Sequence, residues 1–216
     1  SCFGGLAVVR SWPFVLGLTG SIAMGKSETA GMFRRLRVPI FDADREVHQL
    51  LGRGGKAVDL VSETFPSVVK EGAIDRQALG KLVFADSADL RRLEGILHPL
   101  VGSARKRFLQ RAGGSRVSVV VVDVPLLFET KGEVRCDAVV VVSAPDFVQR
   151  QRAMSRADMT AEKLEAILAR QTPDSIKRRR ADFVIATGIG RRVALVAVHK
   201  VLRIIRNGGG SHRRYR

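Results

Sequence analysis

A short glycine-containing segment near the start of the chain carries the strongest chemical signal in the sequence. It reads Gly20-Ser21-Ile22-Ala23-Met24-Gly25-Lys26-Ser27 and matches the G-x-x-x-x-G-K-[ST] pattern at every fixed position. Glycines let the backbone curl so that successive N–H groups point inward at an anion. The segment therefore predicts a nucleoside triphosphate site, in which Lys26 reaches the terminal phosphates and Ser27 binds Mg²⁺.

Two aspartates follow an apolar run, as Asp42-Ala43-Asp44. If the strand continues through them, its alternation aims both carboxylates to one side, beyond the strand end where ligands bind in open α/β sheets. One could then orient or deprotonate an acceptor hydroxyl while the other supports Mg²⁺ or its waters. The alternative is that both cap a helix that begins near Arg45.

A third carboxylate, Asp123, lies near the end of the apolar run 117–124. An acid at the end of a buried strand is typical of the Walker B position, which holds a metal-bound water. The next residues read Pro125-Leu126-Leu127-Phe128-Glu129. Leu126 and Leu127 are either part of a substrate wall or, by default, part of the core.

Cations gather later in the chain. Arg152 and Arg156 are four residues apart on a helical stretch, so we expect them to share a face and to close over a transferring phosphoryl group. A solvated face is the alternative. Lys177–Arg180 has the character of an exposed helix end. His98-Pro99 ends an apolar helical stretch, where a single histidine is more often a cap than a ligand.

The elements that must position these groups follow from five short apolar runs. Two of them, Val119–Val122 and Val139–Val142, are continuous, which is typical of strands buried on both faces of a parallel sheet. Helical patterns separate the runs, at 26–36, 88–110, 161–170 and 191–205. The sequence therefore predicts an α/β fold, a five-stranded parallel sheet with helices on both faces.

One interval is too long for an ordinary crossover. About seventy-five residues separate the second strand from the third, and capped helical patterns fill them, so we expect a helical insertion at about 45–111 that forms a substrate wall. Residues 1–12 are expected to be a loose leader and 207–216 a flexible basic tail, on either side of a domain at 13–206.

Composition narrows the function. The 216 residues are 45% hydrophobic and 27% charged, which excludes wholesale disorder, and two separated cysteines exclude a disulfide scaffold and fit a cytoplasmic protein. No apolar run is long enough to span a membrane. The net charge of +16 favours polyanionic partners or simply a basic surface. The single asparagine, Asn207, excludes the guanine-binding Asn-Lys-x-Asp motif.

The ordered set of motifs resembles the dephospho-CoA kinase family over about residues 14–206. The motifs that carry the resemblance are Gly17-Leu18-Thr19-Gly20 with the loop that follows it, Asp42-Ala43-Asp44, Leu97-His98-Pro99-Leu100, Val124-Pro125-Leu126-Leu127-Phe128-Glu129, Arg152 with Arg156, Arg170-Gln171 and Ala181-Asp182.

The resemblance implies a P-loop kinase that transfers the γ-phosphate of ATP, with Mg²⁺, to the ribose 3′-hydroxyl of dephospho-CoA, the last step of coenzyme A synthesis. It implies a CoA-side helical insertion and a lid at about 146–172. Asp44 matches the family's proposed catalytic aspartate, Lys26 and Arg152 are expected to be catalytic, and Arg156 is expected to bind ATP. The residues expected to meet the acceptor, besides Asp44, are His98, Leu126 and Glu129.

Two other functions remain open: a P-loop kinase of another small hydroxyl substrate, and a basic nucleic-acid-binding ATPase. Aromatic residues make up 6% of the chain and none lies within Lys177–Arg180, so we expect no nucleic-acid partner. The expected protein is a monomer. Many members of the family have Ile-Asp-Asn near the adenine where this chain has Ile185-Ala186-Thr187, so the resemblance does not assign the adenine contacts of this chain.

Overall fold

The computed structural model of the chain describes residues 12–208, except for the side chains of residues 84 and 85. Of the expected leader and tail, only Trp12, Asn207 and Gly208 therefore lie within the described residues. These residues form two compact units. The sheet unit contains 12–41 and 109–208, and the helical unit contains Asp42–Phe108.

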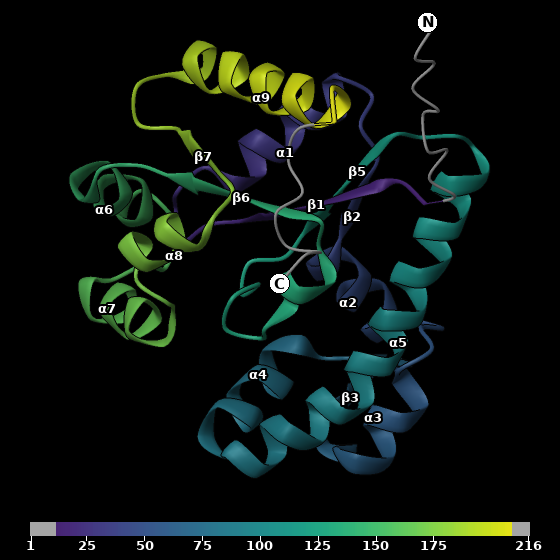
Figure 1. Ribbon diagram of the computed structural model, residues 1–216. Coiled ribbons are helices and arrows are strands. Elements are labelled where there is room, and N and C mark those ends of the chain that lie inside the picture. The colour runs from purple at the N-terminus through teal and green to yellow at the C-terminus, as the bar shows by residue number, and fades with distance from the viewer. Residues whose placement is uncertain (1–11, 209–216) are drawn as a thin grey trace, which may run out of the picture. The chain divides into compact units, whose positions relative to one another are not determined.

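The sheet unit is built on five strands in the order β2-β5-β1-β6-β7 (Figure 1). Their bounds are β1 Phe14–Thr19, β2 Ile40–Asp42, β5 Val119–Asp123, β6 Ala138–Ser143 and β7 Phe183–Ala186. β1 pairs in parallel with β5 and β6, and β6 pairs in parallel with β7. The parallel α/β sheet predicted from the apolar runs is confirmed.

Burial on both faces explains the continuous valine runs. Every residue of β1, β5 and β6 is buried, as expected for central strands covered on both sides. Two helices, α1 (Lys26–Arg35) and α9 (Arg191–Arg206), share one hydrophobic cluster with the sheet and lie beside each other in Figure 1. Another helix, α8 (Asp174–Arg180), contacts β6. Between β6 and α8 lie α6 (Asp146–Met154) and α7 (Ala161–Arg170).

The helical unit has its own core. It contains α2 (Ala43–Leu51), α3 (Val58–Thr64), a short 3₁₀ turn (Pro66–Val68), α4 (Arg76–Ala85) and most of α5 (Ser87–Gly114). A small antiparallel hairpin, β3 (Val69–Lys70) with β4 (Ala73–Ile74), lies within it, and the sequence patterns did not indicate this hairpin. α5 continues through Pro99, so the expectation that a helix ends at His98-Pro99 is wrong.

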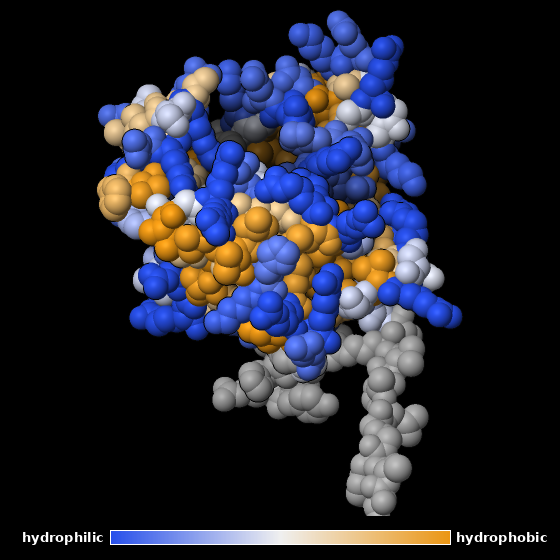
Figure 2. Space-filling view, turned by 90° about the horizontal axis from the view of Figure 1, so that it is seen from above, coloured by the Kyte–Doolittle hydropathy of each residue, from blue (hydrophilic) through white to orange (hydrophobic). Residues whose placement is uncertain are grey.

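The surface mixes apolar and hydrophilic groups. Figure 2 shows the top of Figure 1, where apolar side chains over α9 lie among hydrophilic ones. Val193 and Val196 are the exposed valines of this helix. No helix within residues 12–208 combines the length and the apolar content that a membrane span requires.

Two glycines provide matched tests of this packing. A Cβ at Gly17, in the middle of β1, would lie 2.9 Å from both Cys136 Sγ and Leu127 Cδ2, whereas a Cβ at Gly95 in α5 meets nothing within 4 Å. We expect Gly17→Ala to lower the free energy of unfolding by about 1–3 kcal/mol through overpacking. Gly95→Ala should raise it by up to about 1 kcal/mol, since alanine favours the helix. Urea unfolding measures both, and a stable Gly17→Ala variant would contradict the packing described here.

Candidate active site

The segment 20–27 forms a phosphate-binding type of loop between β1 and α1. Gly25 lies in the left-handed region at φ 89 and directly precedes α1. Both glycines of the loop are packed too closely for a side chain. A Cβ at Gly20 would lie 2.4 Å from Val142 Cγ2, and one at Gly25 would lie 3.2 Å from Thr187 Cβ. A helix N-terminus reached through such a turn presents N–H groups to an anion. The geometry supports the predicted anion site.

Contacts from the residues that follow β6 and β7 hold the second half of the loop. Thr187 Oγ1 donates to Met24 O at 2.7 Å, and the Ala144 N–H lies 3.1 Å from Met24 Sδ. Thr187 follows the carboxyl end of β7, and Ala144 follows that of β6. Thr187, noted in the sequence only as a departure near the adenine, therefore supports the loop backbone as well.

Lys26 and Asp123 meet at the start of α1. Lys26 Nζ lies 2.6 Å from Asp123 Oδ1, and the Asp123 side chain is 5% exposed. Lys26, predicted to bind phosphate, and Asp123, predicted to hold a metal-bound water, are therefore in direct contact in the sheet unit.

Ser27, an exposed residue that directly follows Lys26, adds a hydroxyl as a second hard oxygen donor. Mg²⁺ is commonly held by one or two such donors together with substrate phosphates and water. The donor set of Ser27 and Asp123 fits that ion. Within the described residues, no group of three or more His, Cys, Asp or Glu side chains is placed to hold a metal ion.

The two aspartates of Asp42-Ala43-Asp44 do different things. Asp42 ends β2 and caps α2, accepting from the Arg45 N–H at 3.0 Å. Asp44 lies in the first turn of α2 and is exposed. The expected strand alternation through Asp44 is wrong, because Asp42 caps a helix that already begins at Ala43, two residues before Arg45. The capping alternative holds for Asp42.

The two arginines of the predicted lid do not share a helix face. α6 ends at Met154, so Arg156 lies in the following turn and is exposed, which contradicts the expected face. Arg152 is in the last turn of α6, and its guanidinium donates to Thr187 O at 2.8 Å and to Thr187 Oγ1 at 3.3 Å. Arg152 therefore lies beside the residue that supports Met24 of the loop.

The step after β5 is partly core. Leu127 is 2% exposed and Leu126 is 42% exposed, so the core interpretation is right for Leu127 and wrong for Leu126. In the helical unit, His98 is exposed on α5. Contact of Leu126 and His98 with an acceptor stays a prediction.

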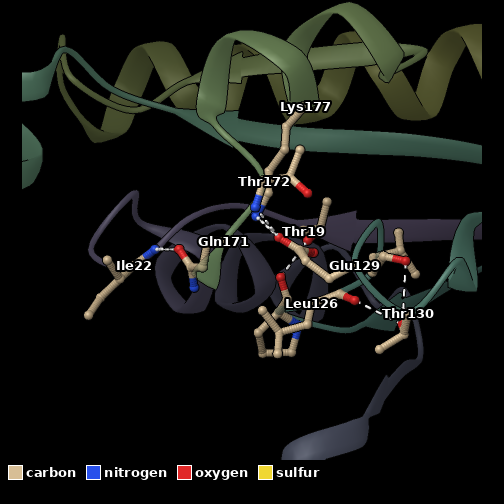
Figure 3. Close-up of polar contacts among 10 residues, drawn as sticks. Thr19, Ile22, Leu126, Glu129, Thr130, Gln171, Thr172 and Lys177 are labelled. Carbon is tan, nitrogen blue, oxygen red and sulfur yellow. Dashed lines mark hydrogen bonds and ion pairs between the residues drawn. The ribbon is translucent and has the colours of Figure 1, made fainter. Parts of the chain in front are cut away.

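Glu129 has two partners, shown in Figure 3. Its Oε1 accepts from the Thr172 N–H at 2.7 Å and lies 3.0 Å from Lys177 Nζ, an ion pair in which the Lys177 side chain is 0% exposed. The expectation of an exposed basic helix end is wrong for Lys177, because it supplies the cation for a partly buried carboxylate. The side chains of Arg178, Arg179 and Arg180 are exposed.

Two effects oppose each other at the Glu129 carboxyl. Burial raises its pKa, while the hydrogen bond from the Thr172 N–H and the ammonium of Lys177 lower it, and the pKa lies below its ordinary value. A carboxyl with a lowered pKa stabilises the folded protein at pH values above its ordinary range, and this contribution is lost as the pH falls through the folded-state pKa.

This pair gives a double-mutant test. Lys177→Met removes the cation and leaves a partly buried carboxylate, so we expect the free energy of unfolding at pH 7 to fall by about 3 kcal/mol. Adding Glu129→Gln, which keeps an acceptor for the Thr172 N–H, should restore more than half of that loss. The double variant should also lose less stability than wild type between pH 6 and pH 3. Urea unfolding across this range checks both; equal losses in the single and double variants would contradict the ion pair.

Comparison with known proteins adds to this geometry. The family model described as dephospho-CoA kinase matches residues 14–190. The chain is 54% identical over 202 residues to a dephospho-CoA kinase of Rhodospirillum rubrum, covering 93% of this chain and 95% of that one. A dephospho-CoA kinase of Paramagnetospirillum magneticum is 58% identical over 164 residues, which cover 76% of this chain and 77% of the relative.

Solved structures agree with the sequence relatives. A Thermus thermophilus protein superposes with a TM-score of 0.79 at 32% identity, covering 88% of this chain and 96% of its own. A dephospho-CoA kinase from Campylobacter jejuni superposes with a TM-score of 0.68 at 26% identity, covering 90% and 98%. With the phosphate-binding type of loop in place, these matches give the conclusion that the chain belongs to the dephospho-CoA kinase family.

Proposed function

We propose that this protein transfers the γ-phosphoryl group of ATP to the ribose 3′-hydroxyl of dephospho-CoA and so makes coenzyme A. The new bond joins the 3′ oxygen to the γ-phosphorus while the bond to the bridging oxygen of ADP breaks, and the hydroxyl proton passes to a carboxylate. The observation that carries the proposal is the family match, which spans the loop, Asp44, His98, Glu129 and Arg152.

In this proposal the sheet unit binds the ATP phosphates. The loop N–H groups, the N-terminus of α1 and the Lys26 ammonium stabilise negative charge on the transferring group. Ser27 and Asp123 would hold Mg²⁺, which neutralises phosphate charge when it is bound. The 2.6 Å contact between Lys26 and Asp123 supports both roles, since it sets the cation and the carboxylate side by side.

The remaining roles follow the family resemblance. Asp44, exposed in the first turn of α2, would orient the 3′-hydroxyl and accept its proton. Arg152 would add positive charge beside the loop, Arg156 would contact ATP, and Leu126, His98 and Glu129 would meet the acceptor side. A monomeric state, a cytoplasmic location and the absence of a nucleic-acid partner stay predictions from the sequence.

The activity itself is tested with the purified protein, ATP, Mg²⁺ and dephospho-CoA. We expect a product whose mass corresponds to coenzyme A and whose added phosphate is on the ribose 3′-oxygen, assigned by phosphorus NMR. Adenosine, shikimate and gluconate serve as competing acceptors, and DNA and RNA as added polyanions. Faster phosphorylation of another acceptor would favour the other small-hydroxyl kinase, and ATP hydrolysis stimulated by nucleic acid would favour the ATPase.

The role of Asp44 has a matched control two residues away. Asp44→Asn keeps the shape and a hydrogen-bond acceptor but removes basicity, so we expect turnover to fall by at least ~10²-fold with the KM values for both substrates little changed. Asp42→Asn should stay near wild type, because asparagine also caps helices well. Steady-state kinetics compare the two. If Asp42→Asn loses the turnover and Asp44→Asn keeps it, the catalytic role belongs to Asp42.

A further inference from the structure

Ile22 of the phosphate loop is held by two glutamine side chains. Gln171 Oε1 accepts from the Ile22 N–H at 3.0 Å, a contact visible in Figure 3, and Gln149 Nε2 donates to Ile22 O at 2.8 Å. Gln149 is 4% exposed. The partners determine the amide orientations, since an N–H needs the amide oxygen and a carbonyl needs the amide nitrogen. Both main-chain polar groups of Ile22 are therefore engaged away from any ligand.

These hydrogen bonds act next to a residue with an unfavourable backbone conformation. Ala23 lies in the left-handed region at φ 60, which an alanine adopts at a cost in free energy. The carbonyl of Ile22 belongs to the peptide that joins Ile22 to Ala23, so its orientation is tied to the φ angle of Ala23. Gln149 fixes that carbonyl. The glutamine therefore helps to hold the turn in which the neighbouring N–H groups face an anion.

The two glutamines come from the two ends of the predicted lid. Gln149 is on α6, and Gln171 directly follows α7. Apolar contacts support the same arrangement, because Ala23 packs in one small cluster with Ala153 of α6 and Leu164 of α7. The loop thus touches both helices of the segment 146–172 through side chains and through its main chain.

Gln171 is itself anchored. The next residue, Thr172, donates its N–H to Glu129, whose charge is balanced by the buried ammonium of Lys177. A change in the position of this junction would move the Gln171 amide away from Ile22. The junction that ends α7 and the loop backbone are therefore linked by a short chain of hydrogen bonds.

We propose that Gln149 and Gln171 are positioning residues for the ATP phosphates: they hold the loop in its anion-binding shape and make nucleotide affinity depend on where α6 and α7 lie. The inference rests on the proposed function only in naming ATP as the anion. Neither glutamine contacts the reacting groups in this account. Each acts through Ile22.

The opposite roles of the two amides give a sharp test. Gln171→Met removes an acceptor and should raise the Kd of Mg²⁺-ATP about 10-fold or more, whereas Gln171→Glu restores an acceptor and should bring the Kd to within about 5-fold of wild type. At position 149 the wild-type side chain donates, so Gln149→Met and Gln149→Glu should both raise the Kd by about 10- to 100-fold. Gln151→Glu, an exposed glutamine on the same helix, controls for the added charge and should leave the Kd unchanged.

Isothermal titration calorimetry without an acceptor measures these affinities, and differential scanning calorimetry measures the Tm of each variant. If the methionine variants lower the Tm but keep the wild-type Kd, the glutamines are merely structural and the inference is wrong. If glutamate has the same effect on the Kd at both positions, the donor and acceptor roles are wrong. A wild-type protein that binds ATP but makes no coenzyme A contradicts the proposed function and leaves this inference standing.

Discussion

A loop that offers main-chain N–H groups to an anion has few of them left to hold its own shape, and here one internal hydrogen bond, from the Met24 N–H to Ser21 O at 3.2 Å, does so. The backbone at 20–25 therefore depends on contacts from elsewhere in the sheet unit. Val142 limits the space behind Gly20, Thr187 supports Met24, and two glutamines engage Ile22. Four parts of the sheet unit meet this constraint, since the carboxyl ends of β6 and β7, the helix α6 and the junction after α7 all contact the loop.

The need to satisfy the main chain near the loop also explains the buried ammonium of Lys177. A lysine without exposed surface is costly unless a carboxylate accompanies it, and Lys177 has Glu129 at 3.0 Å. An apolar pair could fill the same space, but it would leave the Thr172 N–H without its acceptor. The charged pair therefore satisfies the main chain at the point where α7 gives way to α8, next to Gln171.

The features that could be predicted from the sequence are those with a local or periodic signal. The valine runs of β5 and β6 and the glycine spacing of the loop are such signals, and the structure confirms the parallel sheet they predicted. The errors arose where one side chain overrides a period, as when Asp42 starts α2 early and moves Asp44 off the strand. Gln149 gave no signal, because a side chain that binds a distant main-chain group leaves no pattern in its own neighbourhood. Lys177 was misread because its basic neighbours share its charge but not its burial.

The position of β1 has a consequence for how the chain is made. This strand lies in the middle of the sheet, yet its Val15 N–H pairs with Asp137, 122 residues further along. At usual synthesis rates the ribosome needs on the order of ten seconds to add those residues. For most of that time, until β5 has been made, β1 has neither of its neighbouring strands to pair with. A mostly apolar strand is therefore exposed to aggregation early in synthesis, and a fragment that ends before Thr187 would lack the hydrogen bond that supports Met24 of the phosphate loop.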